Sequence, residues 1–170
     1  MIHDLLSIGK RAQQLRQKYK TNDPFVIAEE MGIAVKYCDS FKQLKGMYVV
    51  IARNRFIFLN AGNSEQMNRI VCAHELGHDQ LHRAFAKGSP IQEYGLFDES
   101  AGMEYEANVF AAHLLLGDKE VLSYAAEGKS CGEIASLTEN DPNLVALKVA
   151  CLKEAGYPLN PQIYENRFLK

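Results

Sequence analysis

The sequence lacks the features that mark several large classes of protein. Its 170 residues contain no apolar run that approaches the ~20 residues needed to span a bilayer. The formal net charge is only −2, so no excess of positive charge attracts the chain to nucleic acid or to an anionic membrane. The first residues show no basic segment followed by an apolar one, which predicts that there is no export signal. We therefore expect a cytoplasmic protein with no direct contact to nucleic acid or membrane.

Cysteines are also scarce and widely spaced. They stand at Cys38, Cys72, Cys131 and Cys151, and no two of them form a C-x-x-C pair. A disulfide framework is not expected in a chain of this size without an export signal. We expect reduced thiols, most of them acting as small buried hydrophobic groups.

Helical and β-type patterns follow one another along the chain and predict an α+β fold. Apolar residues at spacings of three and four indicate helices, whereas short runs rich in Val, Ile, Tyr and Phe indicate strands. Asp23 before Pro24 is typical of a helix start, and Asn63 with Gln66 resembles a capping box. Only Arg53-Asn54 separates the last two strands, which predicts a hairpin. The expected helices cover residues 1–22, 24–31, 64–85, 100–116 and 142–154, the expected strands cover 33–37, 46–52 and 55–60, and residues 86–100 are expected to be a loop.

One of these helices carries the motif His74-Glu75-Leu76-Gly77-His78. At about 100° per residue, both histidines fall on the apolar stripe of the helix, one turn apart, so their rings can converge on a single ion. H-E-x-x-H on a helix is the arrangement in which two histidines hold zinc and the glutamate acts as general base. Its position on the buried stripe of a helix that follows a small sheet favours a metal site over a chance match.

A catalytic zinc needs a third protein ligand and an open fourth position. Ala84 stands six residues after His78, which excludes the extended pattern H-E-x-x-H-x-x-G-x-x-H. On a continuous helix, His82 would lie about 12 Å from His74 along the axis, too far to share its ion. We therefore expect His82 to pack, or to form a hydrogen bond behind the site, rather than to bind the metal.

The next helix offers Glu104 as the third ligand. Glu104 and Asn108 are one turn apart at the edge of its apolar stripe, so both can point inward. Asn108 would then form a hydrogen bond that supports the ligands. Glu106 lies about 200° from Glu104 around the helix and is expected to be solvated.

The two motifs together resemble the ImmA/IrrE metallopeptidase family. The matching stretches are residues 74–82 and 104–116, and the resemblance covers about residues 20 to 155 in order and spacing. It implies that His74, His78 and Glu104 bind Zn²⁺ and that Glu75 is the catalytic base. It also implies a minimal zincin-like domain, in which a small, partly antiparallel sheet packs on the active-site helix and other helices surround them. We expect no counterpart of the extra C-terminal sensor domain of larger members, and the chain looks like the short ImmA type.

The resemblance further implies how the chain is organised. We expect a single metallopeptidase domain over residues 1–170. Within it, residues 1–22 form an N-terminal helix, residues 23–117 the catalytic core and residues 118–170 a helical C-terminal part. An edge of the hairpin over residues 46–60 would hold the substrate in an extended conformation by strand addition.

Members of this family cleave helix-turn-helix repressors and so release mobile elements, prophages or stress genes from repression. The expected function is therefore that of a zinc-dependent endopeptidase whose partner is such a repressor. The alternative is a metal-bound regulator that docks on a repressor without cutting it. Residues 127–156 have a faint helix-turn-helix rhythm, but acidic residues outnumber basic ones there, which disfavours DNA binding. Tyr94 and Tyr105 are both available to stabilise an oxyanion, and the sequence does not distinguish them.

Overall fold

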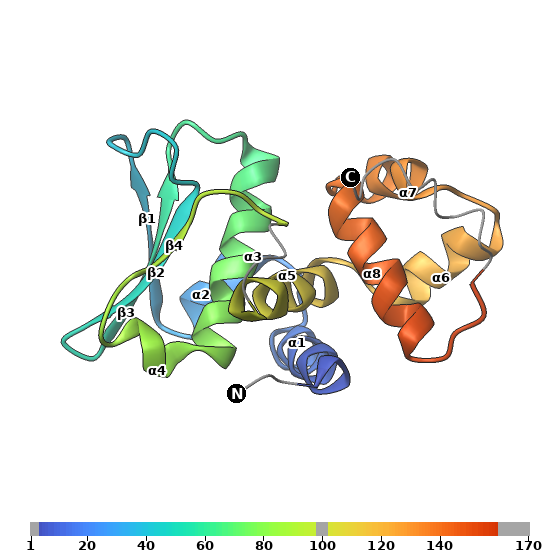
Figure 1. Ribbon diagram of the computed structural model, residues 1–170, viewed down its shortest axis with the longest axis horizontal. Coiled ribbons are helices and arrows are strands. Elements are labelled where there is room, and N and C mark those ends of the chain that lie inside the picture. Colours follow the sequence, from blue (N-terminus) through green and yellow to red (C-terminus); the bar gives the residue numbers. More distant parts are fainter. Residues whose placement is uncertain (1–3, 98–101, 160–170) are drawn as a thin grey trace.

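One four-stranded sheet and eight helices make up the computed structural model, which describes residues 4–97 and 102–159 (Figure 1). The fold is α+β, as the sequence predicts. The helices are α1 (Leu5–Tyr19), α2 (Pro24–Glu30), α3 (Glu65–Leu81), α4 (Arg83–Ala86), α5 (Gly102–Leu115), α6 (Asp118–Ala126), α7 (Cys131–Thr138) and α8 (Pro142–Glu154). The strands are β1 (Ile33–Cys38), β2 (Gly46–Ile51), β3 (Asn54–Asn60) and β4 (Ile91–Glu93). The expected helix start at Ser100 and the tail beyond residue 159 lie outside the described residues.

The sheet has the strand order β1-β3-β2-β4. Strand β1 runs parallel to β3, whereas β2 runs antiparallel to both β3 and β4. The predicted hairpin of β2 and β3 is confirmed, but its turn lies one residue earlier than expected. Ala52 and Arg53 both have positive φ, at 48° and 69°. Two successive left-handed residues give the turn the twist that a two-residue hairpin requires.

Strand β4 lies in the segment that the sequence predicted to be a loop. It is three residues long, too short for alternation of apolar and polar residues to reveal it. It pairs with the start of β2, where Gly46 lies opposite Glu93 and Tyr48 opposite Ile91. This part of the hairpin edge is therefore covered by β4 and is not open to a substrate strand, whereas the rest of β2 has no β4 partner. The outer edge of β4 takes its place at that side of the sheet.

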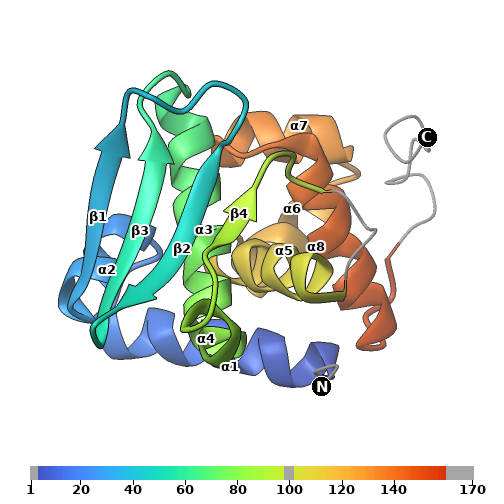
Figure 2. The same cartoon turned by 60° about the vertical axis from the view of Figure 1, so that its left-hand side comes forward.

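Helix α3 lies between the sheet and α5, and α1 and α8 pack against α5 in turn (Figure 2). Ser64 caps α3 by accepting a hydrogen bond from the Met67 N–H at 3.1 Å. The expected cap, Asn63, instead donates its side-chain N–H to Asn68 Oδ1 at 2.9 Å. The helix ends at Leu81 rather than continuing to residue 85. His82 breaks it, with φ −124° and ψ 14°, before the short helix α4.

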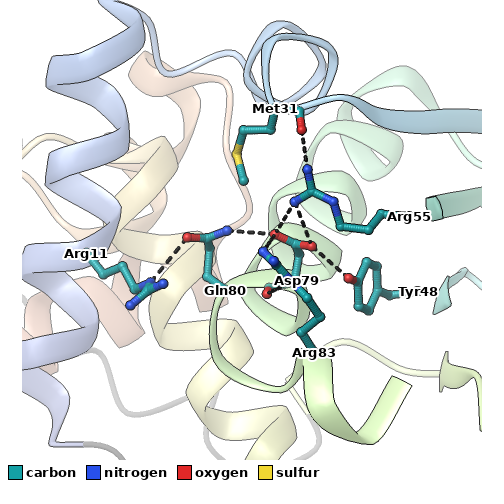
Figure 3. A network of polar contacts seen from close by, with 7 residues as sticks. All are labelled: Arg11, Met31, Tyr48, Arg55, Asp79, Gln80 and Arg83. Atoms are coloured by element: carbon teal, nitrogen blue, oxygen red, sulfur yellow. Dashed lines mark hydrogen bonds and ion pairs between the residues drawn. The ribbon is translucent and has the colours of Figure 1, made fainter. Parts of the chain in front are cut away.

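A buried carboxylate fixes the C-terminal half of α3 to the sheet (Figure 3). Asp79 accepts hydrogen bonds from the Tyr48 hydroxyl at 2.6 Å, from Gln80 at 2.6 Å and from Arg83 at 2.8 Å. Arg55 also donates to Asp79, at 3.2 Å, and to the carbonyl of Met31, the C-cap residue of α2. Burial and the Asp79 hydrogen bond together raise the pKa of Tyr48 well above its usual value. The network therefore joins β2, β3, α2 and α4 around the residue that follows His78.

The predictions about cysteines and membrane spans can be compared with the same structure. The four cysteines all lie in described regions and form no disulfide, and Cys72, Cys131 and Cys151 are buried, as expected. Among the described residues, no helix has both the length and the apolarity to cross a membrane.

Candidate metal centre

Two histidines of α3 and one glutamate of α5 meet in the interior of the protein. His74 Nε2 lies 3.0 Å from His78 Nε2 and 3.1 Å from Glu104 Oε2, and His78 Nε2 lies 3.4 Å from the same oxygen. These three ligand atoms all lie within 4.8 Å of one another. The His74 and His78 side chains are fully buried, and Glu104 retains 23% exposure of its side chain. Two imidazole nitrogens and one carboxylate oxygen are a ligand set that suits zinc.

The close approach of α3 and α5 depends on Gly77, the fourth residue of the H-E-x-x-H motif. A Cβ atom at Gly77 would lie 3.0 Å from Ala107 Cα and 3.1 Å from the Ala107 carbonyl oxygen. The small residues on both helices therefore bring the two backbones together at this level. Because Glu104 stands one turn before the contact, its carboxylate reaches the histidines of the facing helix.

Glu75 is buried beside this group with both carboxylate oxygens lacking a hydrogen-bond partner among the described residues. Burial raises the pKa of Glu75 well above its usual range; the His74 charge opposes this, and the Glu93 and Glu104 carboxylates add to it. A buried polar group without a partner is costly and calls for a functional explanation. A carboxylate that binds water or a substrate would have such an environment.

The electrostatics of the cluster favour a cation. Burial would lower the pKa of His74, but hydrogen bonds to the Glu104 and Glu93 carboxylates raise it to about 10. Burial lowers the pKa of His78 to about 4, despite its hydrogen bond to Glu104. Hydrogen bonds to His74 and His78 overcome the effect of burial and hold the pKa of Glu104 low. Three carboxylates and two imidazoles thus share one buried space, and the donor set fits a divalent metal ion.

Glu93 is a member of this cluster that the sequence did not indicate. It is the last residue of β4 and only 5% exposed. Its Oε2 atom lies 3.0 Å from His74 Nε2, and its Oε1 atom accepts a hydrogen bond from the Gly95 N–H at 2.6 Å. Only the pairing of β4 with β2 brings Glu93 to this cluster. A strand of three residues is too short to be predicted from the sequence. Tyr94, the next residue, is 59% exposed.

Hydrogen bonds support both histidines on the side away from Glu104. Asn108 Oδ1 lies 2.9 Å from His74 Nδ1, so the side chain of Asn108 does point inward. His82 Nδ1 lies 3.0 Å from His78 Nδ1, and Glu106 Oε2 lies 2.8 Å from His82 Nε2. His82 follows His78 by four residues, one helical turn, which makes the two side chains neighbours.

The expectation that Glu106 is solvated is wrong, since only 3% of it is exposed. Glu106 would be solvated only if α5 had a face exposed to solvent. In fact every residue from Glu106 to Leu115 is buried, because α1, α3 and α8 all pack against this helix. A helix that is covered on all sides has no solvated stripe to which a glutamate can be assigned.

Comparison with known proteins gives two matches. Residues 28–149 match the sequence profile of peptidase family M78, described as the IrrE N-terminal-like domain. The chain is also 35% identical over 141 residues to "Uncharacterized immunity region protein 2" of Bacillus phage phi105. That match covers 83% of this chain and 88% of the phage protein.

Proposed function

The chain belongs to the ImmA/IrrE family of metallopeptidases, and on this basis we propose that it is a zinc-dependent endopeptidase that cleaves a helix-turn-helix repressor. The observation that carries the proposal is the position of Glu75. A buried carboxylate without a partner lies beside two histidines and a glutamate whose ligand atoms converge. A purely structural metal site has no use for such a group.

In this proposal His74, His78 and Glu104 hold the ion. A bound zinc ion would act as a Lewis acid, which polarises the scissile carbonyl and makes a water molecule more acidic. The choice of zinc rests on the two imidazoles and one carboxylate, the same set of ligand types found in other zinc peptidases. The three residues come from two helices, so their arrangement depends on the contact between Gly77 and Ala107.

Glu75 then moves the proton. Its carboxylate accepts a proton from the attacking water and later donates it to the departing amine. Gly46 of β2 leaves space for the Glu75 side chain, since a Cβ atom there would lie 2.9 Å from Glu75 Oε1.

The substrate would lie along the outer edge of β4. This strand pairs with β2 on one side and ends at Glu93, whose carboxylate contacts His74. An extended segment that adds to β4 would pass directly beside the proposed ligands. A flexible or locally unfolded part of the substrate meets this requirement better than a folded helix.

The proposal that the substrate is a repressor rests on the family and on the relative. The similar phage protein is named for an immunity region. An anti-repressor of a mobile element or prophage fits that context. A protease of this kind removes the repressor irreversibly, whereas a docking regulator would only compete with DNA.

The test compares metal content and cleavage in four proteins. The wild type should bind about one zinc per chain and cleave a purified helix-turn-helix repressor of the phage-immunity type. Glu104→Ala should lose the metal, and Glu75→Gln should keep it but no longer cleave. Glu120→Ala is the control, because this glutamate is exposed and belongs to α6, which lies on the side of α5 away from α3 (Figure 1). Glu106 cannot serve as the control, since it is buried and hydrogen-bonded to His82.

Two outcomes would contradict the proposal. A wild type that binds no zinc when zinc is supplied would remove the basis for a metallopeptidase. Relief of repression by Glu75→Gln at the wild-type level would instead support a regulator that docks without cutting.

A further inference from the structure

We propose that Glu106 and His82 are positioning residues that fix the tautomer and the orientation of His78, and thereby set the affinity of the site for its metal. The proposal rests on the function proposed above. It concerns a chain of three side chains, His78, His82 and Glu106, which come from α3, the break after α3 and α5. All three are at most 3% exposed.

The contacts form a continuous line that leads away from the proposed ion. His78 Nε2 faces His74 and Glu104, at 3.0 Å and 3.4 Å. The other ring nitrogen of His78 lies 3.0 Å from His82 Nδ1. The far nitrogen of His82 lies 2.8 Å from Glu106 Oε2. Each link is within normal hydrogen-bond distance.

Only one arrangement of protons satisfies every link when both rings are neutral. A ligand nitrogen must be free of its proton, so His78 carries its hydrogen on Nδ1. That N–H donates to His82 Nδ1, which must therefore be the acceptor. His82 then carries its own hydrogen on Nε2 and donates it to the Glu106 carboxylate. The opposite tautomer of His82 would place two N–H groups against each other and would leave Glu106 without this donor.

The two proposed histidine ligands are therefore supported differently. His74 Nδ1 lies 2.9 Å from the oxygen of a neutral amide, Asn108. His78 is supported by an imidazole that is itself bonded to a carboxylate. A carboxylate behind a histidine ligand orients the ring and makes its free nitrogen a better donor to the metal. Here the carboxylate of Glu106 acts on His78 through one additional ring, that of His82.

The backbone around His82 is held in place independently of the metal. The His82 N–H donates to the His78 carbonyl at 2.8 Å, and Arg83 forms an ion pair with Asp79 at 2.8 Å. The first is a regular helical hydrogen bond, and the second ties the residue after His82 to α3. The position of the His82 ring is thus a fixed feature of the fold.

The experiment measures the affinity for Zn²⁺ by competition with a chelator and the visible spectrum of the Co²⁺-loaded protein. The variants are Glu106→Gln, Glu106→Ala and His82→Ala, with Glu120→Ala as the surface control. Each variant at His82 or Glu106 should bind zinc about 10- to 100-fold more weakly than the wild type. The Co²⁺ spectrum should change as well, because it reports the orientation and donor strength of the ligands. Glu106→Gln should be the mildest, since its amide oxygen can still accept from His82.

Loss of folding is separated from loss of positioning by thermal unfolding of the metal-free proteins. Glu106→Gln keeps the size of the side chain, so its metal-free form should unfold close to the wild type while its zinc affinity falls. Wild-type affinity and an unchanged Co²⁺ spectrum in both Glu106 variants would overturn the proposal. A wild type that binds no metal would overturn both proposals. Loss of affinity in the variants, with no cleavage by the metal-loaded wild type, would refute only the peptidase.

Discussion

At the scale of single residues, the site depends on glycines, which leave space, as much as on the residues whose side chains form it. Gly46 faces Glu75 across the start of β2, and Gly77 faces Ala107 across the two helices. Both glycines have ordinary backbone angles, so they are needed for space and not for an unusual conformation. The H-E-x-x-H motif indicates Glu75, but nothing near Gly46 in the sequence indicates that it borders the same group.

Gly46→Ala tests this requirement for space. The added Cβ atom would lie 2.3 Å from Val71 Cγ1 and 2.9 Å from Glu75 Oε1, so both side chains must move. We expect a loss of about 1–3 kcal/mol in the free energy of unfolding and a fall in peptidase activity, with zinc content unchanged. Denaturant unfolding, metal analysis and cleavage rate measure the three effects.

The matched control for this variant is Gly132→Ala. Nothing lies within 4 Å of a Cβ atom at Gly132, which is in α7. This change should stabilise the helix by about 0.5–1 kcal/mol. Full activity in Gly46→Ala would show that Glu75 does not need its observed position.

At the scale of elements, helix α3 shows how far the sequence could be interpreted. Its spacing of apolar residues predicted the helix and the common face of His74 and His78, and the same reasoning on α5 placed Glu104 and Asn108 inward. The break at His82 was not predictable, because its cause is tertiary: the Asp79 network holds Arg83 and α4 against the sheet. The contacts of Glu93 and Glu106 depend on β4 and on the burial of α5, which no local pattern encodes.

Asp79→Ala is the corresponding prediction for α3. The change leaves Arg55, Arg83 and the Tyr48 hydroxyl without their shared acceptor in the interior. Removal of one partner from a buried ionic network costs about 3–5 kcal/mol. We therefore expect a loss of that size in the free energy of unfolding, measured by urea denaturation of the metal-loaded protein.

Arg83→Ala provides the comparison, because the Arg83 side chain is 44% exposed. Its loss should cost no more than about 1 kcal/mol. Equal effects of the two substitutions would mean that Asp79 does not act as the centre of the network.

At the scale of the whole molecule, a second buried polar group connects the C-terminal helices to the rest of the chain. Lys148 of α8 is fully buried and donates to His113 Nδ1 at 2.6 Å and to Asp118 at the start of α6. Gln13 of α1 donates to the other oxygen of Asp118 at 2.6 Å. Four helices therefore meet at one lysine. Two of them, α6 and α8, lie on the side of α5 away from the sheet (Figure 1).

From the environment of His113 we predict that acid lowers the free energy of unfolding. Burial, aided by the Lys148 charge and with a smaller effect from Arg16, lowers the pKa of His113 to about 4. The unfolded chain therefore binds more protons than the folded one between its ordinary value near 6.5 and about 4. Stability should fall through this range as the pH drops, by about 3 kcal/mol in total. The Asp118 carboxylate has a lowered pKa and stays ionised there, so it opposes no part of this loss.

His113→Gln isolates the contribution, because glutamine can accept from Lys148 but does not titrate. The difference in melting temperature between wild type and variant should change between pH 7 and pH 4.5, with the variant less sensitive to acid. Parallel curves for the two proteins would show that His113 has no part in the acid response.

The proposed ligands are divided between two helices, and this arrangement has a consequence for the protein in the cell. An ion held by α3 and α5 together is also a cross-link between them, so the loaded form should resist unfolding more than the metal-free form. Degradation of a protein follows the population of its open state. When zinc is scarce, the protein would therefore lose its activity and also be degraded faster. The supply of zinc would then control the amount of the protein without any change in gene expression.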